Sequence, residues 1–542
     1  MALWAGGPIV IGAFLLWATR GQTFYADEWA FFTRSAGFNA ERLLAPHQGN
    51  MVLSTVLVYK LVLALVGAEN HLAFRLVWIG LDLLCAWLLF SLLRVRVGDF
   101  AALAGALLVS VFGAGWEFFG SSLGITAFVC VAGGLGGLLA LERRRKDWDA
   151  LACLLLAISL ASLSTGLAFL AGAAALIVIG PQWRRRIFVV AIPLLLYAAW
   201  TLWARKYNSS GVTVETVASA PASMVDSLAS ASSALFGAFR IPGPGEEGAS
   251  KLVTFVNKEP GYLLGGLLVV ALAWRIGTAG FKARVAVPLT MLFVYWLSLA
   301  LVSPARIPST GRYQYAASIF ILLLLAEAWR GWRPSRGAQV GIAVALLLAI
   351  VPNLANLGYA SKFVRETSAK DRAILAVADH LEDRVAPGTI LQPPPFGIAE
   401  DMVIDSDDYF RATREFGSPG DTIGQLPSAG PAARDVADRE FVYLLGFAPE
   451  PAAALPTHRC RTVAPGEIGL PGFPVPTGGF AFQSTDGSDV TVGLRRYGDD
   501  YFRFEPSSGG GPFRLAVGAD GIARPWFAAL EASAQVRVCA LS

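Results

Sequence analysis

The sequence predicts a membrane-embedded all-α bundle of about eleven transmembrane helices, followed by an extracytoplasmic α+β or β-sandwich domain. Three observations support this fold class. Hydrophobic residues make up 55% of the 542 residues. Charged residues make up only 15%, whereas soluble proteins contain about 25%. Long apolar runs follow one another up to residue 357, and charge, proline and glycine return after it. We therefore predict two domains, a transmembrane domain over residues 1–357 and a soluble domain over residues 358–542.

The composition also excludes several classes of protein. The high apolar content and the low charge exclude a disordered chain, a collagen-like repeat and a coiled coil. The net charge of +4 is too small to indicate nucleic-acid binding, because the basic residues gather in the loops between apolar runs. We therefore expect a lipid bilayer, and no nucleic acid, as a partner of the chain.

The apolar runs have the length that a bilayer requires, about 20 residues for each helix. The first run begins almost at Met1, without basic residues before it or a cleavage site after it, which indicates a retained anchor. The fifth and sixth runs are separated only by a short connection near residue 165. The eleven predicted spans are residues 3–20, 70–93, 98–116, 120–141, 148–163, 166–180, 187–204, 261–275, 284–303, 312–330 and 337–356.

Lysine and arginine residues predict how the spans are oriented, because cytoplasmic loops are enriched in them. They gather in alternate short loops, around residues 94–96, 143–146, 184–186, 275–284 and 330–336. These loops are expected on the cytoplasmic side. The protein is then a multi-pass protein of the inner or plasma membrane, with a cytoplasmic N-terminus and an extracytoplasmic C-terminal domain.

Two stretches between the spans have an unusual character. Residues 51–67 are apolar enough to span, but counting them as a span would invert every later loop. We expect them to form a helix on the outer membrane surface, with Tyr59 and Lys60 at the interface. Residues 205–260 are rich in Ser and Ala and contain Pro242-Gly243-Pro244-Gly245, so we expect a mobile outer loop.

The C-terminal domain has a different pattern. Residues 365–385 are expected to be helical, and from about residue 440 short β-type runs alternate with Gly/Pro turns. These runs are FVYLLGF, DVTVGLRRY, YFRFEP, FRLAVG and QVRVCAL. Cys460 and Cys539 are the only cysteines of this domain, and an extracytoplasmic compartment permits oxidation. We predict a disulfide between them, the alternative being two free buried thiols.

Ionisable residues at or near membrane depth are costly and therefore mark candidate sites. Asp27 and Glu28 follow the first span directly. Such a pair can deprotonate a hydroxyl group, hold a metal ion or simply face interfacial water. Arg75 and Asp82 lie on one face of the next predicted helix, where they form either packing salt links or part of a site.

The order of these features resembles the GT-C superfamily of polytopic membrane glycosyltransferases, particularly the branch related to protein O-mannosyltransferases and lipid A aminoarabinose transferases. The resemblance covers roughly residues 1–140 and extends to the other spans only by layout. It is carried by the acidic pair, by Pro46-His47 before the surface helix, and by the segment A-x-N-H-L-A-F-R-L at residues 68–76. Glu117 stands in the second outward loop, where such enzymes commonly have another acidic residue.

Members of this superfamily take a sugar from a polyprenyl phosphate and pass it to an acceptor outside the membrane. The resemblance implies that Asp27 is the base that deprotonates the acceptor hydroxyl. Glu28 and Glu117 would then orient the acceptor or a divalent cation, and a cation held by these three carboxylates is the only cofactor that we consider. Attack opposite the leaving phosphate would invert the anomeric centre.

The leaving phosphate of such a donor requires positive charge. Arg306 and Arg312 lie in a short outward connection, against the positive-inside trend, and guanidinium groups suit bidentate contacts to phosphate. Tyr313 and Tyr315 are candidates to line a sugar or lipid pocket. The alternative is an interfacial belt of Arg and Tyr.

His47 and Lys60 are further candidate contacts to the substrate. His47 lies in the segment that carries the resemblance, and Lys60 is a second candidate for the phosphate. A lysine that snorkels to the interface is an equally good interpretation of Lys60.

These observations predict an inverting glycosyltransferase that uses a polyprenyl-phosphate sugar and a glycan, glycolipid or protein acceptor of the cell envelope. A transporter or flippase for a lipid-linked saccharide is the main alternative. It should show internal repeats and interrupted helices, and we see no convincing repeat. A ligase would also use outward arginines, but it would not require an acidic pair after the first span.

Overall fold

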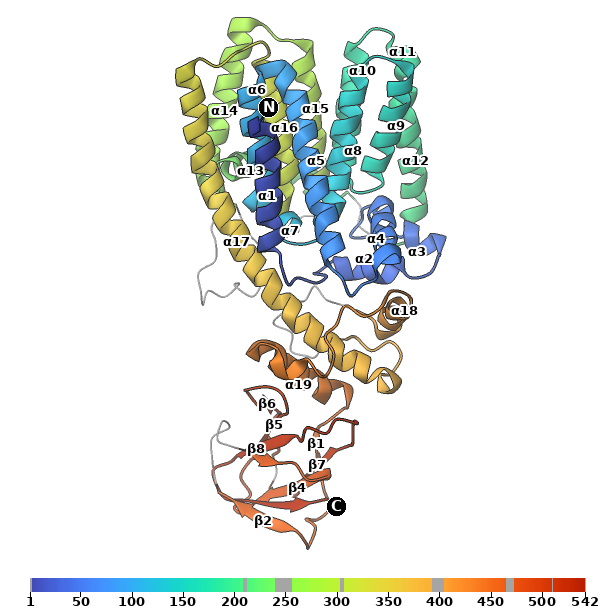
Figure 1. The fold of residues 1–542 in the computed structure, drawn as a ribbon, viewed down its shortest axis with the longest axis vertical. Helices are drawn as coiled ribbons and strands as arrows, with labels where there is room; N and C mark the ends of the chain where they lie inside the picture. Colours follow the sequence, from blue (N-terminus) through green and yellow to red (C-terminus); the bar gives the residue numbers. More distant parts are fainter. Residues whose placement is uncertain are drawn as a thin grey trace. The chain divides into compact units, whose positions relative to one another are not determined.

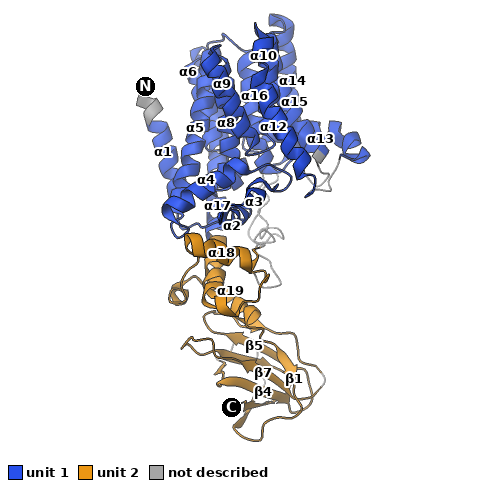
Figure 2. Cartoon of the chain, turned by 90° about the vertical axis from the view of Figure 1, so that its right-hand side faces the viewer, with its two compact units in different colours: residues 1–365 blue, residues 366–542 orange. Residues whose placement is uncertain are grey.

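The apolar runs and the C-terminal segment fold into two compact units, residues 1–365 and residues 366–542 (Figure 2). Helices make up the first unit, and strands and helices make up the second (Figure 1). This computed structural model describes residues 2–207, 212–238, 256–302, 307–391, 404–464, 472–508 and 510–541.

Every predicted span corresponds to a helix in the described residues. These helices are α1 (Ala2–Ala18), α5 (Leu72–Val97), α6 (Asp99–Ser110), α8 (Gly124–Leu141), α9 (Lys146–Leu160), α10 (Gly166–Ile179), α12 (Phe188–Ala204), α14 (Lys258–Ala279), α15 (Ala286–Val302), α16 (Gly311–Ala328) and α17 (Arg336–His380). In the described part of the chain, 7 helical segments are long and apolar enough to cross a membrane. The chain is thus a multi-pass membrane protein by composition, and the number of eleven spans stays a prediction.

Short helices connect these long ones. They are α2 (Glu28–Ser35), α3 (Ala40–Leu44), α4 (Leu53–Val66), η1 (Gly113–Gly115), α7 (Trp116–Phe119), α11 (Trp183–Arg186) and η2 (Ala283–Val285). Helix α4 coincides with the segment that we expected on the membrane surface. The expectation for Tyr59 was wrong, because its side chain is fully buried. It packs against Phe31 and Phe74, with ring centroids 5.4 and 5.2 Å away.

Small residues allow the long helices to pack closely, as is common between helices in membranes. A Cβ atom built on Gly134 of α8 would lie 2.1 Å from the ring of Phe169 on α10. A Cβ atom on the adjacent Gly133 would lie 2.7 Å from the carbonyl oxygen of Leu155 on α9. Larger residues at these two positions would therefore separate α8 from both neighbours.

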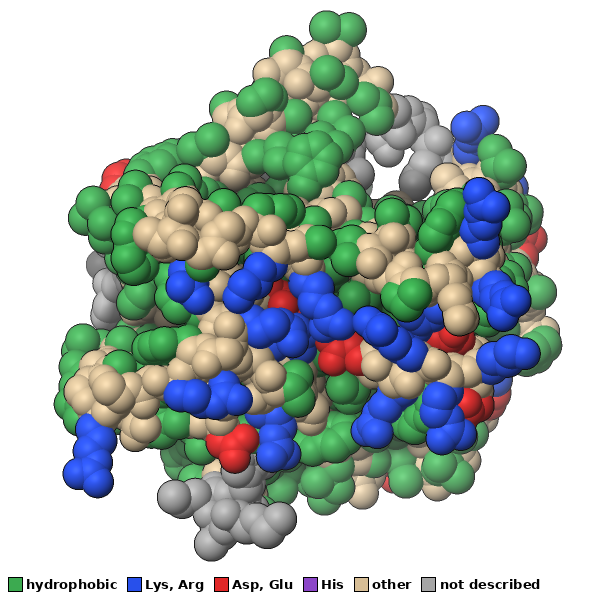
Figure 3. Space-filling model, turned by 90° about the horizontal axis from the view of Figure 1, so that it is seen from above, with side chains coloured by type: hydrophobic (Ala, Val, Ile, Leu, Met, Phe, Trp, Pro, Cys, Tyr) green, Lys and Arg blue, Asp and Glu red, His purple; other side chains and the backbone are tan. Residues whose placement is uncertain are grey.

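Basic side chains gather on the face at the top of Figure 1, which Figure 3 shows from above. Arg96 at the end of α5 pairs with Glu142 after α8 and with Glu327 of α16, both at 2.5 Å. Arg186 donates to the carbonyl oxygen of Leu141 at 2.8 Å. These contacts bring the basic loops together at one end of the helices, which we call the basic end. That the basic end faces the cytoplasm stays a prediction.

Arg75 and Asp82 do not pair with each other. Arg75 donates to the hydroxyl of Thr19 at 3.1 Å and to the carbonyl oxygen of Leu16, so it ties α5 to α1. Asp82 is fully buried within α5. The packing interpretation therefore fits Arg75.

The expectation of a mobile loop over residues 205–260 was wrong for α13 (Val214–Leu235). Alanine is the strongest helix former, and Thr213 begins the helix with a capping box to Thr216. The small side chains of α13 also allow close packing, since a Cβ atom on Gly261 of α14 would lie 1.9 Å from the carbonyl oxygen of Ala229. The Pro-Gly segment lies outside the described residues.

The second unit contains two antiparallel sheets. Their strands are β1 (Pro449–Pro451), β2 (Cys460–Val463), β3 (Phe473–Pro474), β4 (Gly478–Ser484), β5 (Thr491–Arg495), β6 (Phe502–Arg503), β7 (Phe513–Val517), β8 (Phe527–Glu531) and β9 (Val536–Ala540). One sheet has the order β1-β7-β4-β9-β2 and the other β3-β8-β5-β6. Buried apolar residues from both sheets, such as Phe482 and Leu494, share one core. The expected α+β or β-sandwich character is therefore present.

Helices complete the second unit. They are α18 (Ser406–Phe416), α19 (Pro431–Leu444) and the short η3 (Glu382–Arg384) and η4 (Leu426–Ser428). The expectation of a strand at FVYLLGF was wrong, because its first four residues end α19. Ala433, Ala437 and Phe441 recur at helical spacing and bury one face of α19 in the core. The β-type residues at the end of α19 led to the prediction of a strand in spite of this helical spacing.

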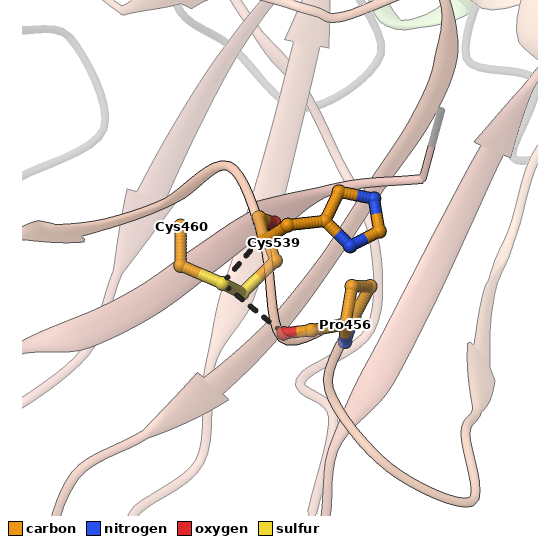
Figure 4. The surroundings of a disulfide bond; sticks show 4 residues. Pro456, Cys460 and Cys539 are labelled. Carbon is orange, nitrogen blue, oxygen red and sulfur yellow. Dashed lines mark hydrogen bonds between the residues drawn. A yellow bond between two sulfur atoms is a disulfide. The ribbon is translucent and has the colours of Figure 1, made fainter.

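Cys460 and Cys539 are direct partners on the adjacent strands β2 and β9. The structure joins them in a disulfide, with their Cα atoms 4.0 Å apart (Figure 4). The sulfur of Cys460 also lies 3.2 Å from the carbonyl oxygen of Pro456. Outside the second unit, Cys85, Cys130 and Cys153 are free.

Candidate active site

A pocket in the first unit spans about 870 Å³, a volume that includes the open space at its mouth. It lies at the end of the helices opposite the basic end, where α16 begins. Five residues predicted from the sequence line it: Asp27, His47, Arg312, Tyr313 and Tyr315. They come from three separate parts of the chain, so the fold brings together residues that are distant in sequence.

The turn before α2 directs Asp27 into this pocket. Ala26 has φ 51°, a left-handed backbone conformation that is strained for alanine. Asp27 follows as the N-cap residue of α2, but its side chain makes no capping hydrogen bond. Its carboxylate is thus available for the pocket, and 24% of the side chain remains exposed.

A second tight turn brings polar groups to the same carboxylate. The backbones of His47 and Asn50 exchange two hydrogen bonds of 3.0 and 2.9 Å. Gln48 and Gly49 between them have φ 47° and 79°, as a turn of type I′ requires. This turn presents Gln48, whose amide nitrogen donates to Asp27 Oδ1 at 3.1 Å. Nε2 of His47 lies 3.1 Å from the same oxygen.

These neighbours change the acidity of Asp27. Burial raises the pKa of Asp27, whereas the hydrogen bond and the charge of His47 lower it. The positive charges of Arg312 and Arg34 lower it further, so the pKa lies below its ordinary value of 3.8. Asp27 is therefore ionised near neutral pH and can accept a hydrogen bond from a hydroxyl group.

Arg312 provides positive charge in the same pocket. It is the second residue of α16, and its side chain is 34% exposed. Its guanidinium lies 3.2 Å from the carboxylate of Glu117 and 5.5 Å from the ring centre of Tyr313. Because Glu117 balances part of its charge, Arg312 is held in place without a bound anion.

The two predicted tyrosines form a wall of the pocket. The hydroxyl of Tyr295 donates to the carbonyl oxygen of Tyr313 at 2.8 Å, which joins α15 to α16. Tyr315 is buried, and its ring lies 5.5 Å from Phe119 and 5.4 Å from Phe128. This wall is aromatic and rigid, which suits a sugar face or a lipid.

Glu28 does not line the pocket. Its side chain is fully buried, and Oε1 accepts a hydrogen bond of 2.6 Å from the backbone N–H of Leu123. Oε2 lies 3.7 Å from Nε2 of His71. Burial raises the pKa of Glu28, and this effect exceeds the opposing hydrogen bonds and the charge of His71. The two consecutive carboxylates thus have opposite pKa shifts.

Three other predicted residues lie elsewhere. Lys60 donates to the carbonyl oxygens of Ser35 and Gly37 at 2.7 and 2.6 Å, so it binds the end of α2 and does not line the pocket. Glu117 does not line the pocket, and its carboxylate lies 3.2 Å from the guanidinium of Arg312, which does. Arg306 lies outside the described residues.

The three predicted carboxylates do not gather around one point. Glu28 faces Leu123, Glu117 faces Arg312, and Asp27 faces the turn of His47. Within the described ranges, no group of three or more His, Cys, Asp or Glu side chains is arranged to hold a metal ion. The predicted ligand set of Asp27, Glu28 and Glu117 therefore does not fit a bound cation.

Sequence analysis missed several polar residues of the pocket. Gln48 and Asn50 lie in the turn that contributes His47, and the oxygen of Asn50 accepts a hydrogen bond of 3.2 Å from the backbone N–H of Ser164. Ser164 and Thr165 come from the short connection between α9 and α10. In the sequence, only the unusual shortness of this connection indicated that Ser164 and Thr165 are special.

Comparisons with known proteins give similarities at the level of structure. No protein-family model matches the sequence, and no curated protein matches it. The chain is similar to the oligosaccharyltransferase of Archaeoglobus fulgidus in its apo form, with 10% identity and a TM-score of 0.42, over 83% of this chain and 69% of that chain.

Two further solved structures are similar. ArnT from Cupriavidus metallidurans bound to undecaprenyl phosphate has 12% identity and a TM-score of 0.41, over 78% of this chain and 86% of that chain. Arabinosyltransferase EmbB from Mycobacterium smegmatis has 12% identity and a TM-score of 0.39, over 98% of this chain and 64% of that chain. All three of these proteins are GT-C glycosyltransferases.

Proposed function

We propose that the protein is an inverting glycosyltransferase. It moves a sugar from a polyprenyl-phosphate donor to a hydroxyl group of a cell-envelope glycan, glycolipid or protein, on the outer side of the membrane. The observation that carries this proposal is that Asp27, an ionised carboxylate, and Arg312, a guanidinium, line one pocket. Glycosyl transfer from a phosphate requires this combination of a base and a cation.

Asp27 acts as the general base. As the acceptor oxygen attacks the anomeric carbon, its proton passes to the carboxylate of Asp27. The bond between the anomeric carbon and the phosphate oxygen breaks at the same time, and its electron pair leaves with the phosphate. Gln48 and His47 hold the carboxylate in one orientation through their contacts at 3.1 Å, which limits the loss of entropy in the transition state.

Arg312 binds the phosphate of the donor. The negative charge on this phosphate increases as the glycosidic bond breaks, so a fixed guanidinium stabilises the transition state more than the ground state. Glu117 pairs with the guanidinium until the donor phosphate displaces it. No step of this mechanism uses a metal ion, because the three candidate carboxylates face different partners.

The remaining lining of the pocket suits a lipid-linked sugar. Polar groups from the His47 turn and from Ser164 and Thr165 lie among apolar side chains such as Leu123 and Leu299. Sugars bind through hydrogen bonds and aromatic faces, whereas a polyprenyl chain requires apolar surface. A pocket with both kinds of lining can hold the part of the donor where the sugar and the polyprenyl chain are joined.

The test of this proposal is sugar transfer by the purified full chain in nanodiscs. Labelled polyprenyl-phosphate sugars, including arabinose and mannose donors, are offered with cell-envelope acceptors. We expect Asp27→Asn to reduce kcat by about 100-fold or more, the contribution of a general base. The matched control is Asp99→Asn, because Asp99 is an exposed carboxylate at the basic end.

Two outcomes would contradict the proposal. Equal transfer by Asp27→Asn and by the unmodified chain would remove Asp27 as the base. Movement of the intact lipid-linked saccharide between membrane leaflets, without transfer to any acceptor, would favour the transporter class.

A further inference from the structure

A second groove lies in the first unit, away from the pocket of Asp27. It spans about 1200 Å³ between α5, α6, α13, α16 and α17, a volume that includes the open space at its mouth. The two cavities share no lining residue and meet different ends of α16. The pocket contains Arg312 to Ala316, whereas the groove contains Leu322 to Trp329.

The lining of the groove is apolar throughout. Leu93, Leu108, Leu325 and Leu346 contribute large side chains. Ala104 and Ala345 contribute small ones, which give the groove its width. Among its lining residues there is no Asp, Glu, Lys or Arg, so the groove offers nothing to a polar ligand.

Several helices around the groove have the length and composition of membrane-spanning helices. Three of the helices that form it, α5, α6 and the first part of α17, belong to segments that are long and apolar enough to cross a membrane. Ala345 of α17 lines the groove and is exposed, so the groove is open to the surroundings of these helices. A long hydrocarbon chain can therefore enter it without passing through water.

The mouth of the groove has a different composition. Trp329 and Trp332, which line it, lie in the connection between α16 and α17 at the basic end, and tryptophan favours the level of the lipid headgroups. Arg333 follows directly. Its side chain lies over the turn between α5 and α6, because a Cβ atom built on Gly98 would lie 3.3 Å from Arg333 Cδ.

No carboxylate of the described residues balances the charge of Arg333. Its guanidinium donates to the carbonyl oxygens of Arg96 and Trp332, at 3.4 and 3.3 Å. In the described part of the chain, no carboxylate lies within ion-pair distance of it. The nearby Arg96 and Arg330, in contrast, both pair with Glu327.

We propose that this groove binds one acyl chain of a glycerophospholipid with an anionic headgroup, and that Arg333 binds its phosphate. The apolar lining matches a hydrocarbon chain, the tryptophans match the glycerol level, and the unbalanced guanidinium matches a negative headgroup. The bound lipid holds the first part of α17 against α5 and α16, so it stabilises the first unit. It is a structural lipid, separate from any donor in the pocket of Asp27.

The first experiment quantifies the phospholipid that co-purifies with the full chain in mild detergent, by mass spectrometry of the extracted lipid. We expect Arg333→Gln to reduce retained anionic lipid about fivefold, as loss of one basic contact at a membrane surface predicts. The matched control is Arg185→Gln, because Arg185 is also an exposed arginine at the basic end but lies on α11, which contributes no residue to the groove, whereas Arg333 directly follows the lining residue Trp332.

A second pair of variants tests the acyl chain. Ala345→Phe fills the groove, and Val344→Phe adds an aromatic ring at an exposed neighbour that does not line it. We expect Ala345→Phe to lose the lipid and Val344→Phe to retain it. Equal lipid content in the two variants, or in Arg333→Gln and Arg185→Gln, would overturn the proposal.

A third measurement uses only the unmodified chain and does not depend on the folding of variants. Delipidated protein is returned to vesicles of phosphatidylglycerol or phosphatidylcholine, and its melting temperature is measured. We expect a higher melting temperature in phosphatidylglycerol. The same melting temperature in both lipids, or a lipid-free dimer that buries the groove between two copies, would refute an anionic lipid as the occupant.

Discussion

Asp27 and Glu28 are consecutive residues whose carboxylates lie in opposite environments. Asp27 faces the pocket, where Nε2 of His47 lies 3.1 Å from Oδ1. Glu28 is fully buried and accepts a hydrogen bond of 2.6 Å from the N–H of Leu123. Successive residues of a helix point about 100° apart, so a single acidic pair contributes one carboxylate to the pocket and one to helix packing.

The first prediction concerns the pH dependence of the proposed base. His47 is the main cause that lowers the pKa of Asp27 against the effect of burial. Replacement of His47 by Ala should therefore raise this pKa. A base must be ionised to act, so activity is lost as the pH falls through its pKa. We expect the acidic limb of the kcat/KM profile to move to higher pH in His47→Ala.

The variant His47→Gln is the control, because glutamine restores a hydrogen-bond donor without the charge. Its acidic limb should lie between those of the unmodified chain and of His47→Ala. Identical profiles for all three proteins would show that His47 does not tune Asp27. The profiles are measured by labelled sugar transfer in nanodiscs at constant ionic strength.

The second prediction concerns Glu28 and stability. Burial raises the pKa of Glu28 above its ordinary value of 4.5. The folded state therefore binds this proton more tightly than the unfolded state. The stability that comes from protonated Glu28 is fully present below pH 4.5 and is lost as the pH rises through the raised pKa. We expect Glu28→Gln, which cannot ionise, to remove this part of the pH dependence.

Glu28→Ala gives the contrasting result. It leaves the buried N–H of Leu123 without an acceptor, and we expect a loss of about 1–3 kcal/mol in the free energy of unfolding. Melting curves of the detergent-solubilised chain, recorded by tryptophan fluorescence at several pH values, measure both effects. Equal stability of the Gln and Ala variants would mean that this hydrogen bond contributes nothing.

The third prediction separates Arg312 from Glu117. A hydrogen bond to a charged group contributes about 1.5–3 kcal/mol, so Arg312→Gln should raise the KM for the donor about tenfold or more. Glu117 pairs with the same guanidinium at 3.2 Å and competes with a phosphate for it. We therefore expect Glu117→Gln to lower the KM for the donor. Both KM values come from initial rates at saturating acceptor. An unchanged donor KM in Arg312→Gln would favour the alternative that Arg312 belongs to an interfacial belt of Arg and Tyr.

The sequence predicted the helices of the first unit well, because an apolar run of about 20 residues has few other stable structures in a membrane. It failed for α13, whose small polar and alanine residues lack an apolar run. It also failed at Phe441, where β-type residues end a helix. In both segments a helical signal is present, the alanines and the Thr213 cap of α13 and the spacing of Ala433, Ala437 and Phe441 in α19, but the missing apolar run and the β-type residues outweighed it.

For the candidate site, the sequence indicated which residues are chemically unusual but not where they point. Asp27 and Arg312 were found because charged residues are rare beside apolar spans, and His47 was found because it lies in the segment that carries the resemblance. The direction of Glu28 depends on the left-handed turn at Ala26, and no composition rule predicts such a turn there. The contacts of Lys60 to backbone carbonyl groups could not be predicted either, because they depend on the path of the chain after α2.

The fourth prediction concerns the disulfide of the second unit. Cys460 and Cys539 are 79 residues apart. Closing this loop lowers the entropy of the unfolded chain, which raises its free energy by about 4–5 kcal/mol at 25 °C in the chain-entropy model. The two residues already face each other on β2 and β9, so their replacement by Ser should leave the strand pairing intact. We expect the double variant of the full chain to be cleaved faster by protease within residues 404–541, and Cys153→Ser, which removes a free cysteine, to match the unmodified chain. Equal cleavage of the double variant and the unmodified chain, with or without reductant, would show that the cross-link does not stabilise this unit.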